Sequence, residues 1–533
     1  MVKTLMSFKI IAPRSKNIAS INTANIQDAL NHTEQLQEES NSIKNALKQE
    51  SRNRKYRLGS LEVDPYRAGS SAEESLSKTP RVGTQMFTPA CLNYCQAANL
   101  IPHLLPEVAS TLKNTSYKTS MVPEDESLIT SDEKIESESK KIRLDRVLDQ
   151  QNLPEIHHTS IDHFINVPGY KKLDSFSQFT ATENSLTLMD IHDPCLRYQA
   201  RPESIKPWKS GKEFATLATT NGLFKISPSA YVDIISSFKM DMAVCLYDCM
   251  PNVATKASKT GLIKQMEFKL ETPNQKRVAK SIERTSKWTE ICTQSASIPG
   301  TSLISAVIGG PYSDLRARSA QLALALGDKI SGFLVANLHG GEKEKLEQLQ
   351  QTLDALQIAS SYKPIFSWEF VTPREILLAV EKGVDIFDST YPYLATEHGY
   401  ALTFDCLGAA HFNPLAMINL NRPTSKHVSE FQDDIAPISE SCSCYACSNR
   451  FSRAYIVHLL NTHEMLATIL LMCHNFQVYL DFFESIRTSI YRGCFESNKD
   501  IFIEKYTNAD WFEFLDAELT LPPNQRANSP TLE

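Results

Sequence analysis

The residues best suited to chemistry are three cysteines that lie within six positions near the C-terminal end of the chain. Cys442, Cys444 and Cys447 form a C-x-C-x2-C pattern, and the proline and serines before them are typical of a turn. Such a turn can bring three thiolates onto one ion, and Zn2+ prefers four tetrahedral ligands drawn from thiolate and imidazole. The spacing therefore predicts a metal site that needs one further ligand.

The fourth ligand should come from the helical stretch that follows the cysteines. That stretch contains His458, His463 and His474, and residue chemistry alone does not choose among them. Cys473 is a poor ligand if His474 binds, because neighbours on a helix point about 100° apart. A closed set of three thiolates and one imidazole leaves no position for a substrate, so the ion is expected to be structural. The alternative is that the three cysteines are buried and bind no metal, since cysteine is a common small core residue.

The elements that would position such a site follow an alternating pattern. Short apolar runs of strand length are separated by amphipathic segments of helix length, which indicates parallel strands with crossover helices. At least five such strands favour an α/β fold of the TIM (β/α)8 barrel type over a doubly wound sheet. A long helical region follows the cysteines, and a break in it is expected near Cys473. The five runs are Met242–Asp248, Leu303–Gly310, Gly332–Leu338, Pro364–Phe370 and Val384–Pro392.

Composition and charge narrow the class of protein. The 533 residues are 42% hydrophobic, enough for a sizeable core, and the formal net charge of −7 argues against non-specific coating of nucleic acid. The 12 cysteines show no regular disulfide spacing, and the N-terminus lacks the features of a signal peptide. No run approaches the ~20 apolar residues needed to span a bilayer. We therefore expect an intracellular protein without an integral membrane segment, where clustered cysteines bind metal more often than they form disulfides.

The cysteine segment and the residues after it resemble a known zinc signature. "CSCYACSNRFSRAY", followed later by "HNF", is similar to the signature of the tRNA-guanine transglycosylase family, in which an S/T-R-A-Y element and a histidine-asparagine pair follow C-x-C-x2-C. The resemblance implies that the histidine of "HNF" is the fourth ligand. One structural Zn2+ per subunit would then be held by Cys442, Cys444, Cys447 and His474. The other two histidines become ordinary helix-face residues.

Further segments resemble the same family. "QKRVAKSIERTSKW", "GGPYSDLRARSAQLAL" and "GVDIFDSTYPYLATEHGYALTF" are similar to its motifs, and the resemblance covers roughly residues 241–490. It implies a TIM barrel with a zinc-binding subdomain inserted near the C-terminus. The expected organisation is a variable, partly disordered N-terminal region (1–54), the start of the barrel domain (55–112), a disordered acidic insertion (113–150), the barrel domain (151–435), the zinc-binding subdomain with dimerisation helices (436–492) and a C-terminal extension (493–533).

The family resemblance also points to two carboxylates. Catalytic members exchange guanine at the wobble position of certain tRNAs for a 7-deazaguanine base, and an aspartate attacks the anomeric carbon of the ribose. That nucleophile maps to Asp388, and a base-binding aspartate maps to Asp248. An aspartate at the end of a barrel strand could equally cap the next helix. The D-S-G-G-F-Q motif of catalytic members is absent, and its region is expected near Thr216–Tyr231.

The pocket that reads the base departs from the catalytic pattern at several positions. The glutamine of Q-G-G is Ile308, and two glycines of G-G-L-A-V-G-E are Ala336 and Asn337. An apolar side chain cannot hydrogen-bond the base, and any Cβ narrows the slot. Leu394 and Glu397 stand at the two arginine positions of P-T-R-x-x-R, so a negative charge replaces a positive one where tRNA phosphate would lie.

These departures match the non-catalytic eukaryotic branch of the family. Membership of that branch implies a subunit, inactive alone, that pairs with a catalytic subunit and supports exchange of guanine for queuine at the wobble position of tRNAs with GUN anticodons. A homodimer is the alternative assembly. The implied location is the cytoplasm, with peripheral association at the mitochondrial outer membrane as a variant. Two other functions stay open: an active transglycosylase with altered base specificity, and a zinc-stabilised scaffold with no tRNA role.

Basic residues offer a surface that could hold tRNA. The usual explanation of such residues is a solvated helix face. They are Lys264, Lys269, Lys276, Arg277, Lys280, Arg284 and Lys287, together with Arg450 and Arg453 after the cysteines.

Overall fold

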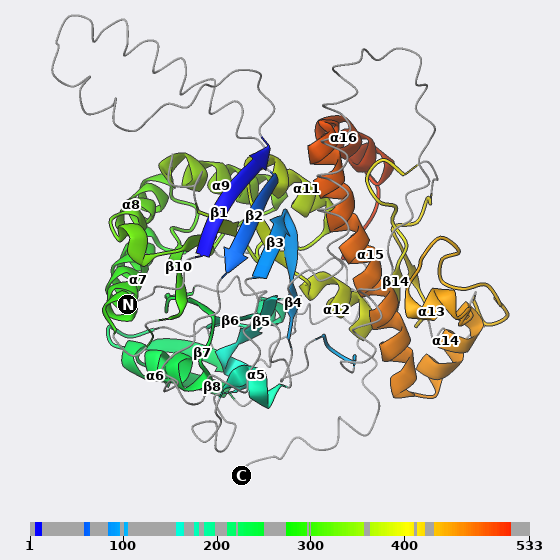
Figure 1. Cartoon of the computed structure of the whole chain (residues 1–533), viewed down its shortest axis with the longest axis horizontal. Helices are drawn as coiled ribbons and strands as arrows, with labels where there is room; N and C mark the ends of the chain where they lie inside the picture. The colour runs from blue at the N-terminus through cyan, green and yellow to red at the C-terminus, as the bar shows by residue number, and fades with distance from the viewer. Residues whose placement is uncertain are drawn as a thin grey trace, which may run out of the picture.

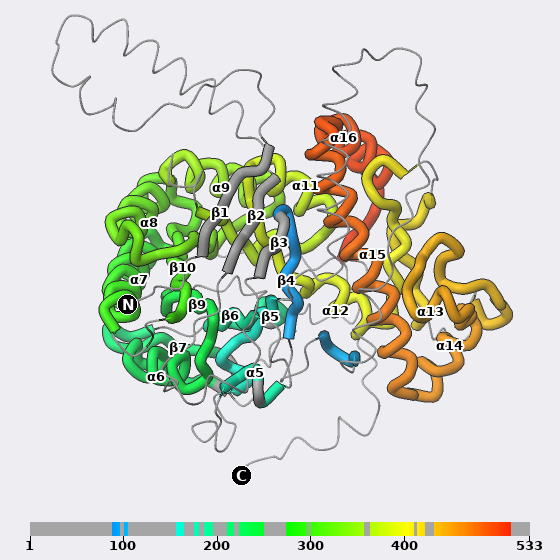
Figure 2. Tube along the Cα trace, in the orientation of Figure 1, coloured from blue at the N-terminus to red at the C-terminus, as the bar shows by residue number. Residues whose placement is uncertain are grey.

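The structure is a computed structural model, and it is described here for part of the chain (Figures 1 and 2). The described residues are 6–12, 58–63, 84–95, 101–104, 156–164, 175–180, 186–197, 210–219, 222–249, 273–295, 298, 300–356, 363–409, 413–421 and 431–512. The expected acidic insertion 113–150 and the last residues of the C-terminal extension lie outside these ranges.

Eight parallel strands close into a barrel, which confirms the expected TIM-type fold (Figure 1). The barrel closes where the last strand pairs with the first, with Asp388 opposite Leu92. Each of the five apolar runs expected to form strands contains a barrel strand, and the strands are shorter than the runs. In barrel order the strands are β4 (Ala90–Tyr94), β5 (Ile156–Ser160), β6 (Leu186–Asp190), β9 (Met242–Val244), β10 (Ser302–Val307), β11 (Gly332–Val335), β12 (Ile365–Phe366) and β13 (Ile386–Asp388).

Helices alternate with the later barrel strands, as the amphipathic segments predict. In helix α11 (Pro373–Lys382), local residues define both the first and the last turn. Thr372 and Glu375 form a reciprocal capping box at its start, Pro373 occupies its first turn, and Gly383 ends it with a φ of 110°. The helices are α6 (Pro228–Phe238), α7 (Gln275–Gln294), α8 (Ser313–Leu324), α9 (Glu342–Leu356), α11 (Pro373–Lys382) and α12 (Thr390–Glu397).

Smaller elements complete the barrel domain. An antiparallel sheet of β1 (Met6–Ala12), β2 (Leu58–Val63) and β3 (Thr84–Thr88) adjoins the N-terminal end of β4, because β3 runs directly into it. The described part of the expected N-terminal region 1–54 is therefore a strand. The other short elements are α5 (Phe176–Phe179), the hairpin β7 (Ala215–Thr219) and β8 (Gly222–Ile226), and the 3-10 turns η4 (Ile161–His163), η6 (Pro194–Arg197) and η7 (Gly327–Lys329).

A subdomain follows the last barrel strand. It contains β14 (Tyr400–Leu402), β15 (Met417–Asn419), α13 (Tyr445–Ser448) and α14 (Arg453–Asn461), and it is followed by α15 (Met465–Arg492) and α16 (Phe495–Lys505). Figures 1 and 2 show α15 running between the barrel and the pair α13–α14. Residues early in α15 join the apolar core of the subdomain, and later ones join the core of the barrel. One helix therefore fastens the subdomain to the barrel.

The expected break near Cys473 is wrong. Cys473 lies inside the continuous helix α15, and the break comes earlier, between Asn461 and Met465. His463 adopts a φ of 56° there, and its N–H bonds back to the carbonyl of Leu460. A left-handed residue ends an α-helix, so the chain turns at this point and not at the apolar stretch downstream.

Helix α15 is long and apolar enough, by length and composition, to cross a membrane. The expectation that no stretch approaches this length is therefore too strict. Its most apolar window has a mean hydropathy of 1.3 and is 67% buried inside the structure. Buried helices in protein cores have the same composition, and the packing of α15 against two apolar cores accounts for it.

Candidate metal centre and barrel mouth

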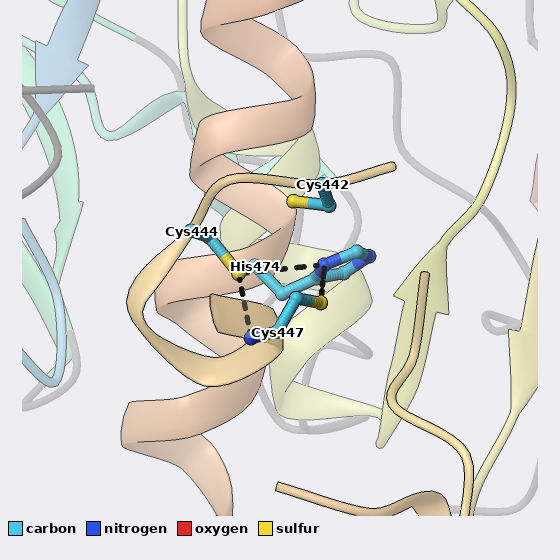
Figure 3. Close-up of side chains that lie close together, drawn as sticks. All are labelled: Cys442, Cys444, Cys447 and His474. Carbon is cyan, nitrogen blue, oxygen red and sulfur yellow. Dashed lines mark hydrogen bonds between the residues drawn. The ribbon is translucent and has the colours of Figure 1, made fainter. Parts of the chain in front are cut away.

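Cys442, Cys444, Cys447 and His474 lie together, as the sequence and the family resemblance predict. Figure 3 shows their side chains converging from the loop around α13 and from α15. One ligand atom from each of the four lies within 4.8 Å of all the others. The Nδ1 atom of His474 is 3.4 Å from the Cys447 sulfur and 3.7 Å from the Cys444 sulfur. Three thiolates and one imidazole in this arrangement can hold a metal ion.

The local sequence folds the cysteine segment into one helical turn. Cys444 caps α13, and its sulfur accepts the N–H of Cys447 at 3.3 Å. A spacing of three residues in a helical turn puts these two sulfurs on one side. Arg450 then adopts a φ of 56° and reverses the chain, and Ser452 caps α14 by accepting the N–H of Tyr455. Contacts between neighbouring residues thus arrange the cysteine segment, and only His474 comes from a distant part of the sequence.

The distant ligand is oriented by the strand next to it. The Nε2 of His474 lies 2.7 Å from the carbonyl oxygen of Leu402. Donation of the Nε2 proton to that oxygen leaves the Nδ1 lone pair directed at the sulfurs, as is usual for a metal-binding histidine. Asn475 fastens the same strand, since its Oδ1 accepts the N–H of Leu402 and its Nδ2 donates to the carbonyl of Tyr400, both at 2.8 Å. The histidine-asparagine pair therefore both positions the ligand and pins β14.

The electrostatics of the cluster favour a bound cation. Hydrogen bonds with the other two thiols, and then burial, raise the pKa of Cys442, whereas hydrogen bonds from Cys442 and Cys444 lower the pKa of Cys447. Burial opposes the charged form of His474, but the neighbouring thiolates outweigh it and raise its pKa to about 10. A negative charge on one sulfur thus makes ionisation of the neighbouring thiols unfavourable. A bound metal cation would neutralise this repulsion between thiolates.

The alternative ligands lie elsewhere. His458 is exposed on α14, and His463 is exposed in the turn after it, so it is not on a helix face as expected. Cys473 is buried beside His474 but outside the cluster, and burial raises the pKa of its thiol to about 12. The fold therefore selects His474 from the three histidines.

Asp388, at the family nucleophile position, is the last residue of β13 and is 2% exposed. Its Oδ1 accepts the N–H of Thr390 at 2.9 Å, at the start of α12. The carboxylate therefore bonds to the backbone at the first turn of α12, from the residue before the N-cap Ser389.

Asp248 is charge-paired within the fold. Its Oδ2 accepts from both Nε and Nη2 of Arg284 on α7, with the Nε contact at 2.9 Å. The carbonyl oxygen of Asp248 accepts from the Nδ2 of Asn337 at 3.2 Å. The Oδ2 of Asp248 is therefore held in a charge-assisted pair within the fold.

Buried side chains stand at the positions after β10 and β11 where the sequence departs from the catalytic pattern. Ile308 is fully buried, and its N–H donates to the Oγ of Ser319 at 3.1 Å. Asn337 keeps a left-handed backbone with a φ of 54°, the conformation that glycine adopts most easily. Its side chain occupies the space beside Asp248 that a glycine would leave open, and Ala336 next to it is buried as well.

Glu397 interacts with a histidine from a distant part of the chain. Its Oε1 lies 2.7 Å from the Nε2 of His103, and the His103 ring stacks on Tyr393 with centroids 6.0 Å apart. The segment 101–104 therefore lies against α12, where this pair replaces one of the arginines of catalytic members. Leu394, at the other arginine position, is buried.

The region expected to correspond to D-S-G-G-F-Q lies outside the barrel strands. Thr216–Tyr231 forms the β7–β8 hairpin and the start of α6. The third barrel strand, β6, instead ends at Asp190, whose Oδ2 accepts from the Nε1 of Trp368 at 2.7 Å. His158 stacks on the same tryptophan with centroids 4.4 Å apart. The apolar run before Asp190 could have revealed this strand, had the alternating pattern been traced further upstream.

Several of the basic residues are engaged in the fold. Arg284 points inward to Asp248, and Arg453 pairs with Asp434 at 2.9 Å and donates to the carbonyl of Ile438. Arg450 pairs with Glu440 on the surface. Lys276, Lys280 and Lys287 are exposed on α7, whereas Lys264 and Lys269 lie outside the described residues.

The chain resembles known proteins over most of these elements. A model of the family described as "Queuine tRNA-ribosyltransferase" matches residues 172–508. The chain is 30% identical over 328 residues to a "Queuine tRNA-ribosyltransferase accessory subunit 2" of Culex quinquefasciatus, covering 60% of this chain and 69% of the relative. It is 37% identical over 252 residues to a protein of the same name from Xenopus tropicalis, covering 41% and 59%. A "Queuine tRNA-ribosyltransferase" of Nostoc sp. is 30% identical over 269 residues, covering 50% and 61%.

Proposed function

The chain belongs to the queuine tRNA-ribosyltransferase family, and from this premise we propose that it is the non-catalytic subunit of a heterodimeric enzyme of that family. The subunit pairs with a catalytic chain and supports exchange of guanine for queuine at the wobble position of tRNAs with GUN anticodons. Alone it exchanges no base. The proposed location is the cytoplasm.

One contrast carries the proposal. The four-residue metal cluster is complete and well oriented, whereas the pocket that would read a base has lost its complementary groups. Ile308 and Asn337 fill two loops, and Arg284 neutralises Asp248. Recognition of a base requires several matched groups at once, so one or two retained carboxylates are insufficient. A chain that keeps the subdomain and loses the pocket is best explained by a supporting role.

The proposed ion is Zn2+, bound by Cys442, Cys444, Cys447 and His474. Three thiolates and one imidazole are a soft donor set that suits zinc, and their tetrahedral closure leaves no position for a substrate. The ion would join the α13 turn to α15 and so hold the subdomain on the barrel. Its role would be structural.

The subdomain also offers a surface for a partner. Phe451 stacks on Tyr455 and lies at a tilt to Tyr445, with both ring centroids 6.0 Å away, and the two tyrosines are 40% and 41% exposed. Exposed aromatic residues are typical of the energetic centres of protein interfaces. We name Tyr445, Phe451 and Tyr455 the aromatic face, and we propose that the catalytic subunit docks on it.

Base exchange should require both chains. We expect no guanine exchange by this chain alone, and exchange when a catalytic queuine tRNA-ribosyltransferase subunit is added, measured with labelled guanine or queuine in tRNA. Asp388→Asn should leave the rate of the complex within about twofold of wild type, because the asparagine oxygen can still accept the N–H of Thr390.

Two outcomes distinguish the alternatives, and a further experiment tests the basic surface. Turnover by the isolated chain, abolished by Asp388→Asn, would favour an active transglycosylase with altered specificity. Failure to co-purify with a catalytic subunit, together with no effect on its exchange rate, would favour a scaffold with no tRNA role. Charge reversal at Lys276, Lys280 and Lys287 tests whether the exposed face of α7 holds tRNA in the complex.

Removal of one ring from the aromatic face should weaken the heterodimer. We expect Tyr455→Ala to raise the dissociation constant for the catalytic subunit at least about tenfold, the effect of losing roughly 1.4 kcal/mol at an interface centre. Phe224→Ala is the matched control, since Phe224 is similarly exposed (38%) but lies on β8. Equal affinities of both variants and wild type, measured by calorimetry, would place the interface elsewhere.

A further inference from the structure

A second group of potential metal ligands lies at the mouth of the barrel, apart from the cysteine cluster. It consists of Asp162, His163 and Asp193, whose ligand atoms all lie within 4.8 Å of one another. Asp162 and His163 belong to the turn that directly follows β5, and Asp193 comes three residues after β6. The carboxyl ends of neighbouring parallel strands meet at one face of a barrel, which brings these three side chains together.

One of the three side chains has an oxygen without a partner. Asp162 is only 9% exposed, and among the described residues no hydrogen bond reaches its Oδ1. Buried polar atoms are nearly always satisfied by protein, water or an ion. A buried carboxylate with an open oxygen, grouped with an imidazole and a second carboxylate, is a position where a cation can bind.

The geometry of the other two ligands fits a metal ion. The Nε2 of His163 lies 3.0 Å from the Oδ2 of Asp193. Adjacent ligands of an octahedral ion at about 2.1 Å are separated by about 3.0 Å. Tyr94 donates its hydroxyl to Oδ1 of Asp193 at 2.9 Å, and the N–H of Cys195 donates to the same oxygen at 2.8 Å. These two bonds hold the carboxylate so that Oδ2 faces the imidazole, as outer partners do in metal sites.

We propose that Asp162, His163 and Asp193 bind one divalent first-row metal ion at the barrel mouth. Two carboxylates and one imidazole form a harder donor set than the cysteine cluster and suit Mn2+ or Fe2+ better than a thiolate site does. Three ligands from the described residues leave positions for water. The His163 side chain is 11% exposed, which gives the ion a route from solvent. This site is independent of the proposed pairing with a catalytic subunit.

The test is Mn2+ binding to the purified full-length chain, with free Mn2+ measured by electron paramagnetic resonance. We expect one saturable site in the wild type. Asp162→Asn, which keeps the shape of the side chain, and His163→Ala should each weaken binding at least about tenfold. His458→Ala is the matched control, because His458 is an exposed histidine far from this cluster in the fold. The zinc content should stay unchanged in all three variants.

A spectroscopic readout makes the test independent of any variant. The electron spin echo of Mn2+ bound to the wild-type chain should show the modulation of one imidazole nitrogen. The contrasting explanation is a plain hydrogen bond from His163 to Asp193 with no ion. Absence of saturable Mn2+ binding, or binding without a nitrogen signal, would overturn the proposal, as would equal affinity of Asp162→Asn and wild type.

Discussion

Replacement of Cys444 by serine should release the bound metal and unfold the subdomain. Cys444 is fully buried, caps α13 and faces His474 across the cluster. A serine oxygen is a much poorer ligand for a soft site than a thiolate. Binding of structural zinc contributes on the order of 10 kcal/mol in small zinc peptides, so the loss of one ligand should remove several kcal/mol.

The effect should be concentrated in one part of the molecule. The apolar core of the subdomain is separate from that of the barrel and includes Cys444 and Cys447 themselves. We expect α13 and α14 to lose protection from hydrogen exchange, while the barrel strands keep most of theirs. Zinc per chain, measured by mass spectrometry, should fall from one to near zero, and the same loss of zinc should follow treatment of the wild type with a strong chelator.

Cys473→Ser is the matched control for this experiment. It makes the same chemical change in a buried residue next to His474, but outside the cluster. The variant should keep its metal and lose only the modest stability expected for a hydroxyl in an apolar site. Retention of one zinc ion by Cys444→Ser, with an unchanged melting temperature, would contradict the assignment of the cluster.

Replacement of Arg316 by methionine should destabilise the barrel strongly. Arg316 is fully buried on α8 and donates to the carbonyl oxygens of Gly310 and Asn337, both at 2.7 Å. It also donates to the side chains of Thr352 and Gln348. Methionine fills similar space but leaves the two carbonyls without these donors. The Asn337 carbonyl keeps a contact with the Nδ1 of His339 at 2.9 Å, so the cost falls on the Gly310 carbonyl, which loses its Arg316 donor. An unpaired buried acceptor costs about 1–3 kcal/mol, and we expect a loss of that size in the free energy of unfolding.

The electrostatics of this arginine explain why its hydrogen bonds matter. Burial lowers the pKa of Arg316 to about 9, and the charge of Glu369 only partly opposes this. The charged form therefore depends on the surrounding carbonyl dipoles. Because Arg316 holds the loops at residues 308–310 and 336–339 together, its loss should also loosen the altered base pocket. Lysine would not substitute, since one ammonium cannot reach several carbonyls at fixed angles.

Arg318→Met is the control on the same helix. Arg318 is 51% exposed and reaches Glu283 only at 3.5 Å across the surface. Exposed ion pairs contribute about 0–1 kcal/mol, so this variant should differ little from wild type in urea denaturation. Similar losses for Arg316→Met and Arg318→Met would show that the buried hydrogen bonds do not carry the stability assigned to them.

Local spacing was sufficient for the features that depend on nearby residues. The C-x-C-x2-C pattern predicted three ligands, and alternating apolar runs predicted five barrel strands, because a turn and a strand are defined by consecutive residues. The family resemblance also implied that Ile308 and Asn337 depart from a base-reading pocket. The choice of His474 needed the family resemblance, since three histidines were chemically equivalent until the chain was folded.

Tertiary structure alone decided the contacts between distant segments. It paired Asp248 with Arg284 and Glu397 with His103, and it moved the break in the C-terminal helix to the left-handed turn at His463. It also brought Asp162 and His163 to Asp193, which no spacing suggested. The reason is physical: closure of a parallel barrel makes neighbours of strand ends that are far apart in sequence, and no local pattern records which side chains will meet there.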